Sequence, residues 1–187
     1  MDVFPHAHTI VKFHGVMLRP LHQHIWLTKM INYIQQDITT VDQGVVAHGC
    51  NCQGVMGAGV ALAIRNKWPK AYDAYAHLCK TYENTSDMLG VAHFVTVEKD
   101  RHGAAVIVAN LFTQLNFGSD GKAYANLDAI TSTLDEVVRL AMKAELPVYL
   151  PRIGCGLGGL DWGTQVGPIV EALAVKYSNV DINVCDL

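Results

Sequence analysis

The sequence predicts an α/β fold, a three-layer α/β/α sandwich with a mixed central sheet. Short runs of β-branched and apolar residues alternate along the chain with segments whose apolar residues recur at helical spacing. Half of the 187 residues are hydrophobic and 17% are charged, a composition that excludes general disorder. The length fits one domain, because two full domains would be cramped.

The first half of the domain is expected to begin with two strands. Residues 31–34 alternate apolar and polar side chains, and residues 45–48 form a short apolar run. A glycine-rich segment, residues 49–59, follows the second run. Two helices are expected next, over residues 60–68 and 70–82, because a proline between them ends the first.

The middle of the chain holds two further strands and the clearest helix. Residues 92–97 and 104–111 are β-rich runs, separated by a polar turn that contains a glycine. A helix is expected over residues 127–144, because apolar residues recur there at a period near 3.6. These apolar residues are Leu127, Ile130, Leu134, Val137, Val138 and Ala141.

The last part of the chain repeats the order of strand, glycine-rich segment and helix. Residues 148–150 are expected to form a buried strand, and a second glycine-rich segment lies at residues 154–159. A helix over residues 162–177 and a strand over residues 182–185 complete the predicted domain, which runs from residue 30 to residue 187.

Residues 1–29 are expected to be an extension, either a poorly ordered arm or an upstream segment, because they show no sustained periodicity. They also lack the features of a signal peptide. Five histidines lie in this segment, which could form either a metal site or an unstructured arm. No metal is expected, because these histidines lack good ligand spacing. They are His6, His8, His14, His22 and His24.

The charge balance excludes several classes of function. With 14 Lys and Arg against 17 Asp and Glu, the chain lacks the basic surface that nucleic-acid binding relies on. No apolar run reaches the roughly 18 residues of a membrane span. Five cysteines, an odd number without a secretory signal, favour a reducing compartment, so a cytoplasmic location is expected.

Both glycine-rich segments lie where a strand ends and a helix begins, a position that suits a phosphate or diphosphate. The alternative for either segment alone is a tight turn without a ligand. Gly154, Gly156 and Gly159 spell G-x-G-x-x-G, but a Rossmann fingerprint would open the first βαβ unit. Since no P-loop motif is present either, neither of these nucleotide folds is predicted, and no cofactor is expected.

Taken together, three segments resemble the macrodomain family, the ADP-ribose-binding α/β module. They are residues 31–38, 47–61 and 150–162. The resemblance implies that Asp37 accepts a hydrogen bond from the adenine amino group, that Asn51 contacts the distal ribose, and that the glycines flank the diphosphate. The ligand-binding residues expected from it are Asp37, Ile38, Gly54, Met56, Gly57, Gly59, Val60, Thr113, Gly154, Cys155, Gly156, Leu157 and Gly158.

Within the family, the sequence resembles the branch of ADP-ribose 1''-phosphate phosphatases and terminal ADP-ribose protein glycohydrolases. The segments 48–52 and 111–113 are similar to the phosphatases, and the segment 151–157 is similar to the glycohydrolases. Those glycohydrolases use a lysine on a central strand and an aspartate after G-C-G-L. Here that position is Gly158, and residues 106–113 contain no lysine.

The expected function is therefore removal of the terminal phosphate of ADP-ribose 1''-phosphate, with His48 and Asn51 as catalytic residues. His48 would position or deprotonate water, because a histidine pKa lies near neutrality; the alternative is a hydrogen-bonded histidine at a strand end. Two other functions stay open: a non-catalytic ADP-ribose-binding module, and a hydrolase that removes ADP-ribose or O-acetyl groups. The expected partners are ADP-ribose or a derivative and ADP-ribosylated macromolecules.

Overall fold

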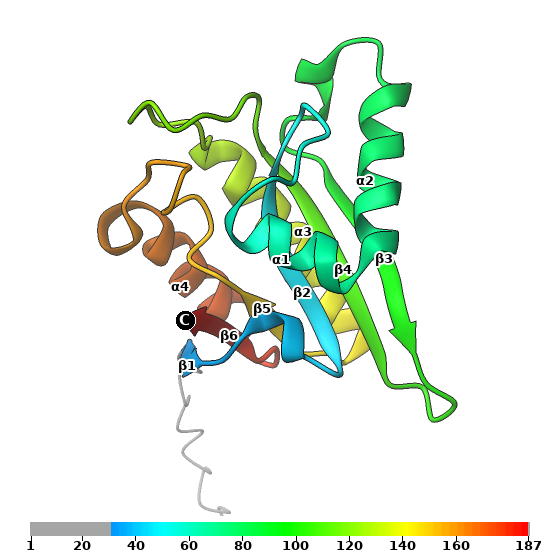
Figure 1. Cartoon of the computed structure of the whole chain (residues 1–187). Helices are drawn as coiled ribbons and strands as arrows, with labels where there is room; N and C mark the ends of the chain where they lie inside the picture. Colours follow the sequence, from blue (N-terminus) through cyan, green and yellow to red (C-terminus); the bar gives the residue numbers. More distant parts are fainter. Residues whose placement is uncertain (1–30, 187) are drawn as a thin grey trace, which may run out of the picture.

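A six-stranded mixed sheet forms the middle layer of the computed structural model, which describes residues 31–186 (Figure 1). The strand order is β1-β6-β5-β2-β4-β3. All neighbouring pairs are parallel except β3 and β4, which are antiparallel at one edge. The strands are β1 (Asn32–Gln35), β2 (Gly44–Asn51), β3 (Ala92–Lys99), β4 (Ala105–Gln114), β5 (Val148–Leu150) and β6 (Ile182–Asp186).

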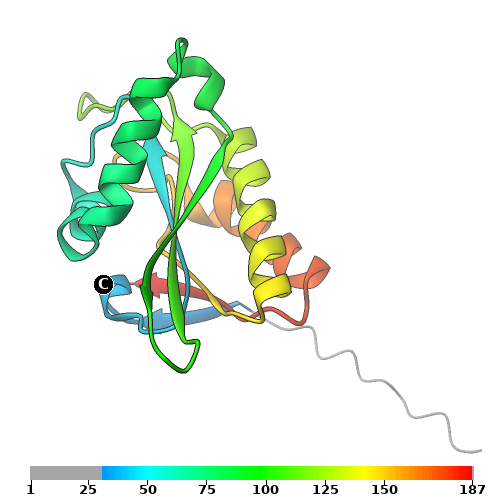
Figure 2. The same ribbon diagram turned by 90° about the vertical axis from the view of Figure 1, so that its right-hand side faces the viewer.

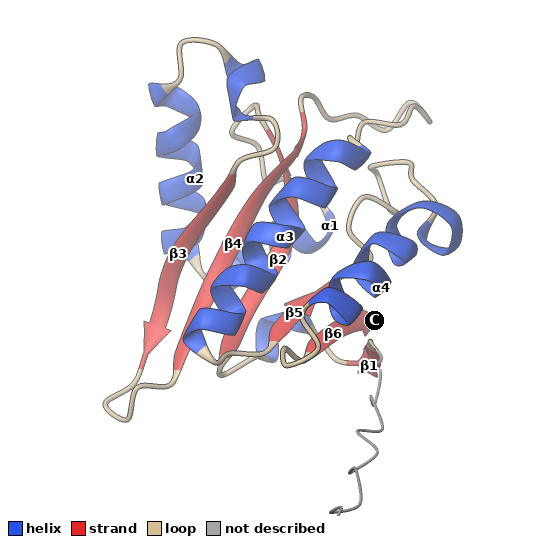
Figure 3. Cartoon of the chain, turned by 180° about the vertical axis from the view of Figure 1, so that it is seen from behind, coloured by secondary structure: helices blue, strands red, loops and turns tan. Residues whose placement is uncertain are grey.

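Two helices cover each face of the sheet, so the predicted three-layer fold is confirmed (Figures 2 and 3). On one face lie α1 (Gly59–Lys67) and α2 (Pro69–Thr81), and on the other lie α3 (Leu127–Ala144) and α4 (Gly167–Lys176). The short helices are η1 (Ile38–Thr40), η2 (Thr85–Met88) and η3 (Trp162–Val166), the last of which is a π-helix.

Helix α3 has the bounds that its apolar period predicts. The apolar residues that recur at this period pack in or against the main core. Asn126 caps its start, because the side chain accepts a hydrogen bond from the Ala129 amide at 2.8 Å. The helix ends where Glu145 adopts a left-handed conformation with φ of 55°. Pro69 at the start of α2 likewise separates α1 from α2.

Strand β2 extends three residues beyond the prediction, to Asn51. Gly49 and Cys50 continue the ladder, opposite Leu111 and Phe112 of β4. The glycine serves the strand rather than a loop, because a Cβ there would lie 2.8 Å from Thr113 Oγ1. The first glycine-rich loop is therefore shorter than predicted and runs from residue 52 to residue 58, between β2 and α1.

The predicted helix over residues 162–177 is divided in two. Its first five residues form the π-helix η3, and α4 follows from Gly167. At Gly167 a Cβ would lie 2.7 Å from the Trp162 carbonyl oxygen, so this position needs a glycine. The expectations for residues 1–29 lie outside the described residues. Within residues 31–186, no helix combines the length and the apolar character that crossing a bilayer requires.

Candidate functional site

The chain leaves β2 and β5 toward opposite faces of the sheet, although these two strands are neighbours. From β2 it enters α1 on one face, and from β5 it enters η3 and α4 on the other. Open α/β sheets bind ligands beyond the carboxyl ends of their strands at such a switch point. The loop between β2 and α1 (residues 52–58) and the loop between β5 and η3 (residues 151–161) both begin there.

Asp37 also lies at the carboxyl ends of the strands, just after β1. Its Oδ1 accepts from the Thr39 amide at 2.9 Å and the Thr39 hydroxyl at 2.8 Å, and these bonds lower the carboxyl pKa. The side chain is exposed, and its Oδ2 has no partner among residues 31–186. β1 and β2 are three strand spacings apart, which is about 14 Å. One free carboxylate oxygen is therefore available at the far end of the site.

The loop between β2 and α1 presents backbone N–H donors. The amides of Gly59, Val60 and Ala61 lack intrahelical acceptors, as in the first turn of any helix, and the N-cap residue Ala58 has no side-chain acceptor for them. Gly57 and Gly59 are exposed, and Gly59 has φ of 56°, a conformation that favours glycine. Uncapped N–H groups and the positive end of the helix dipole together suit an anion.

The loop between β5 and η3 contributes a second set of donors. Gly156 and Leu157 are exposed, and their amides have no acceptor among residues 31–186. A Cβ at Gly156 would meet nothing within 4 Å, so the space beside this backbone is open. Gly154 and Gly159 hold the turn with φ of 77° and 79°. The loop can therefore approach a ligand closely through its backbone.

Gly158 holds this loop together rather than facing outward. It is buried, and its carbonyl oxygen accepts from the Tyr124 amide at 2.9 Å and the Ala125 amide at 3.0 Å. A Cβ at this position would lie 2.5 Å from the Gly154 carbonyl oxygen. The loop thus has no room for a side chain at residue 158.

The Asn51 side chain is hydrogen-bonded to the backbone of the loop between β2 and α1. Its Oδ1 accepts from the amides of Gln53 at 2.9 Å and Val55 at 3.3 Å, and also from the Tyr75 hydroxyl at 2.9 Å. Its Nδ2 donates to the Val55 carbonyl at 2.6 Å. Since an amide nitrogen has two N–H groups, one donor of Asn51 is left for a ligand.

His48 lies in the interior, on the same face of the sheet as α2. The residue is 1% exposed, and its Nε2 is 2.8 Å from the Asn110 Oδ1. Burial lowers the imidazole pKa to about 4, because the charged form is poorly solvated, so the ring is neutral at pH 7. This position favours the alternative interpretation, a hydrogen-bonded histidine near a strand end, over contact with substrate.

Three other expected ligand residues have side chains in the core: Ile38, Met56 and Thr113, which are 4%, 1% and 1% exposed. Their side chains are therefore not exposed to a ligand in this structure. Cys155 is half-buried, its thiol donates to the Ile153 carbonyl at 3.4 Å, and burial raises the thiol pKa. A raised pKa makes a nucleophilic role for this cysteine unfavourable.

Asp161 is the N-cap of η3. Its Oδ1 accepts from the Thr164 amide and hydroxyl, each at 2.7 Å, and closes the start of η3. The anion-binding groups of the second loop are therefore its free amides and not the helix that follows. Among residues 31–186, no three His, Cys, Asp or Glu side chains converge as a metal site would require.

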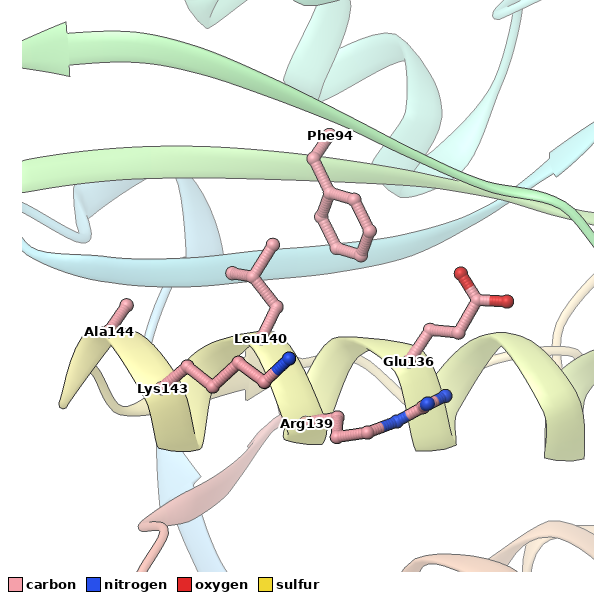
Figure 4. A pocket seen from close by; sticks show the side chains of 6 residues that line it. All are labelled: Phe94, Glu136, Arg139, Leu140, Lys143 and Ala144. Atoms are coloured by element: carbon pink, nitrogen blue, oxygen red, sulfur yellow. The ribbon is translucent and has the colours of Figure 1, made fainter.

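A separate depression of about 520 Å³ lies between β3 and the C-terminal half of α3 (Figure 4). Its lining combines apolar and charged side chains: Phe94, Glu136, Arg139, Leu140, Lys143 and Ala144. It contains none of the expected ligand residues, and α3 runs away from the switch point after its start beside Thr113. The depression is thus distinct from the two glycine loops.

Sequence reasoning missed Tyr75, which contacts Asn51 from α2. Its only sequence signal is its place in a helical pattern, which predicts burial but not a hydrogen-bond partner. Two aromatic residues lie in the segment between β4 and α3: Phe117 is 50% exposed, and the Tyr124 hydroxyl donates to Asp120 at 2.8 Å.

Comparison with known proteins agrees with this geometry. The Macro domain family model matches residues 47–167. The chain is 30% identical over 180 residues to a Debaryomyces hansenii protein named ADP-ribose 1''-phosphate phosphatase, an alignment that covers 83% of this chain and 98% of that protein. It is 32% identical over 143 residues to a Mycobacterium bovis protein named DNA ADP-ribosyl glycohydrolase, covering 76% of this chain and 38% of that protein.

Among solved structures, the macrodomain of Mycobacterium tuberculosis DarG matches with a TM-score of 0.70 at 26% identity, covering 84% of this chain and 99% of that chain. The residues that match the family model contain both glycine loops. The chain therefore belongs to the Macro domain family.

Proposed function

We propose that the protein binds ADP-ribose across the carboxyl edge of the sheet and removes the terminal phosphate of ADP-ribose 1''-phosphate. The single observation that carries the binding proposal is the pair of free backbone donor sets at the switch point, in the loops before η3 and α1. Two such sets suit the two phosphates of a dinucleotide-like ligand. Asp37 follows β1, which is three strand spacings or about 14 Å from β2, and supplies an acceptor for an adenine amino group.

The charges around the site support recognition by amides rather than by basic side chains. The chain carries a net charge of −3, and the cation in the second loop, Arg152, already forms a bidentate pair with Asp186, with two bonds of 2.8 Å. An anionic ligand would therefore be neutralised mainly by N–H dipoles. In this arrangement the remaining N–H of Asn51 meets the distal ribose or the attacking water.

Phosphate release is favoured over the glycohydrolase reaction by two features of the site. No lysine lies between residues 106 and 113 of β4, and Gly158 occupies the position at which the related glycohydrolases carry an aspartate. A side chain at residue 158 would collide with the Gly154 carbonyl oxygen. The relative named ADP-ribose 1''-phosphate phosphatase, which aligns over nearly its whole length, supports the same choice.

Hydrolysis needs a water held close to the phosphorus atom and donors for the charge that develops on the phosphoryl oxygens. The amides of Gly156 and Leu157 serve the diphosphate, so the remaining N–H of Asn51 is the group that would orient the water. His48 takes no direct part in this proposal, because its neutral ring is buried; it instead joins β2 to β4 through Asn110.

A second function, a non-catalytic ADP-ribose-binding module, is favoured by one observation. The two residues expected to be catalytic do not form an exposed acid–base pair: His48 is buried, and Asn51 keeps a single free N–H. Such a module would read free or macromolecule-linked ADP-ribose. We place either function in the cytosol, because all five cysteines are unpaired thiols, as in reducing compartments.

One panel of ligands tests these functions. Binding by calorimetry and turnover would be measured with ADP-ribose, ADP-ribose 1''-phosphate, O-acetyl-ADP-ribose, and ADP-ribosylated protein and DNA. We expect the protein to release phosphate from ADP-ribose 1''-phosphate. The rate should fall in Asn51→Ala and stay unchanged in Asn179→Ala, a control at an exposed residue just before β6, away from the carboxyl ends of the strands. Tight binding without turnover of any substrate would select the binding module, and release of ADP-ribose from protein or DNA would select the glycohydrolase.

A further inference from the structure

We propose that Tyr75 is a positioning residue of the ADP-ribose site, which acts by holding Asn51 and thereby the backbone donors of the loop between β2 and α1. The inference rests on the proposed function for the identity of the ligand. Its structural part, the link from α2 to the loop, is tested independently of any ligand.

The Tyr75 hydroxyl reaches Asn51 from the neighbouring helix. It is 2.9 Å from the Asn51 carbonyl oxygen and 2.9 Å from the Asn51 Oδ1. Both atoms are acceptors, so the phenol is the donor and its single hydrogen is shared between them. Burial raises the pKa of Tyr75 well above its usual value, so the hydroxyl keeps this hydrogen throughout the ordinary pH range.

The ring of Tyr75 is held rigidly, which makes the hydroxyl a fixed point. Tyr75 is fully buried and stacks on Phe112 of β4, with ring centroids 5.5 Å apart and planes inclined by 30°. It packs in the same cluster as Cys50 of β2 and as Cys52 and Met56 of the loop. Since the residue has no exposed surface, it does not touch a ligand and acts only through its neighbours.

The bond is placed where the strand ladder is irregular. The pairing of β2 with β4 shifts register between Cys50 and Asn51, so regular sheet hydrogen bonding ends at this point. The phenol hydroxyl therefore supplies a donor to the Asn51 carbonyl at the last residue of the strand. It fixes the residue from which the loop departs.

Asn51 connects Tyr75 to the loop whose amides are proposed to bind the ligand. Its Oδ1 accepts from the amides of Gln53 and Val55, and its Nδ2 donates to the Val55 carbonyl. Val55 lies four residues before Gly59, whose amide belongs to the uncapped first turn of α1. Loss of the phenol hydroxyl would remove one of the four hydrogen bonds of the Asn51 side chain and the donor to the Asn51 carbonyl. The loop would then be held less firmly, and the amides that follow could shift away from the diphosphate.

The decisive variant is Tyr75→Phe, which keeps the ring and removes only the hydroxyl. Tyr72→Phe, one turn earlier on α2, is the matched control, because the Tyr72 ring stacks under Arg65 and has no bond to Asn51. We expect Tyr75→Phe to weaken ADP-ribose binding about tenfold, the usual effect of removing one partner of a buried hydrogen bond. In phosphate release, KM should rise while kcat changes little, because the loop holds substrate and transition state alike.

Two further measurements separate positioning from a general loss of stability. Amide hydrogen exchange of Gln53 and Val55 should become faster in Tyr75→Phe and stay unchanged in Tyr72→Phe. In the Asn51→Ala background, Tyr75→Phe should weaken binding less than it does in the wild type, because the two residues act through one network.

The possible outcomes decide the inference separately from the proposed function. Unchanged exchange at Gln53 and Val55, or ADP-ribose affinity equal to that of Tyr72→Phe, would overturn the role of Tyr75 even if the wild type binds ADP-ribose tightly. If the wild type binds no ADP-ribose, the proposed function fails. Faster exchange would then still support the link between Tyr75 and the loop, and unchanged exchange would refute it.

Discussion

Replacing Gly158 with alanine tests whether the second glycine loop is held closed by the absence of a side chain. The added Cβ would lie 2.5 Å from the Gly154 carbonyl oxygen and 2.9 Å from its Cα, whereas real Cβ atoms keep at least 3.0 Å from such atoms. These atoms belong to the backbone, so the loop must open by about half an ångström. Overpacking of this kind costs about 2 kcal/mol, which lowers Tm by about 4–8 °C in a domain of this size.

The opened loop should also bind ADP-ribose more weakly, because the amides of Gly156 and Leu157 move with it. Gly156→Ala is the matched control, since a Cβ there meets nothing within 4 Å and should leave Tm unchanged. If the diphosphate lies against this loop, Gly156→Ala should nevertheless weaken binding, because the new methyl group occupies ligand space. Thermal unfolding and calorimetry measure both effects. A wild-type Tm for Gly158→Ala would refute the reasoning from crowding, and wild-type affinity for Gly156→Ala would move the ligand away from this loop.

Three further predictions concern other parts of the molecule. The pKa of His48 is about 4 in the folded protein against 6.5 in the unfolded chain, so its contribution to the free energy of unfolding should fall by up to about 3 kcal/mol as the pH drops from 6.5 to 4. Above pH 6.5 this contribution should not change. Urea unfolding at several pH values should show this dependence in the wild type and less of it in His48→Gln. Asp37→Ala should weaken ADP-ribose binding about tenfold but barely affect the inosine analogue, which lacks the amino group; equal losses for both ligands would contradict the adenine contact. A chain starting at Met30 should keep the wild-type Tm and ADP-ribose affinity, and a loss of either would show that residues 1–29 belong to the folded unit.

Local patterns predicted most of the fold because each reports a single physical requirement. The apolar period of residues 127–144 reports one buried helical face, and the structure has the same bounds. Pro69 reports a missing N–H, and two helices meet there. The prediction ended β2 too early because Gly49 has two meanings: in the sequence it resembles a loop, whereas in the fold it makes room for Thr113.

The candidate site was predictable where the backbone acts and less so where side chains act. The glycine loops were located from sequence because glycine spacing after a strand is a local signal. The roles expected for His48 and Thr113 depended on exposure, and both residues are 1% exposed. Exposure depends on which helix covers a strand, and no local pattern in β2 or β4 contains that information.

The sequence by itself determined the α/β class, the order of the main strands and helices, and the positions of the two glycine loops, because these follow from composition, periodicity and short-range stereochemistry. Only the tertiary structure decided which groups meet at the switch point. It buried His48 under α2 and left one of the two side-chain N–H groups of Asn51 unbonded. It also brought Tyr75, 24 positions along the chain, into contact with Asn51. Hydrogen bonds and burial depend on three-dimensional neighbours, and the helices that provide them are distant in sequence.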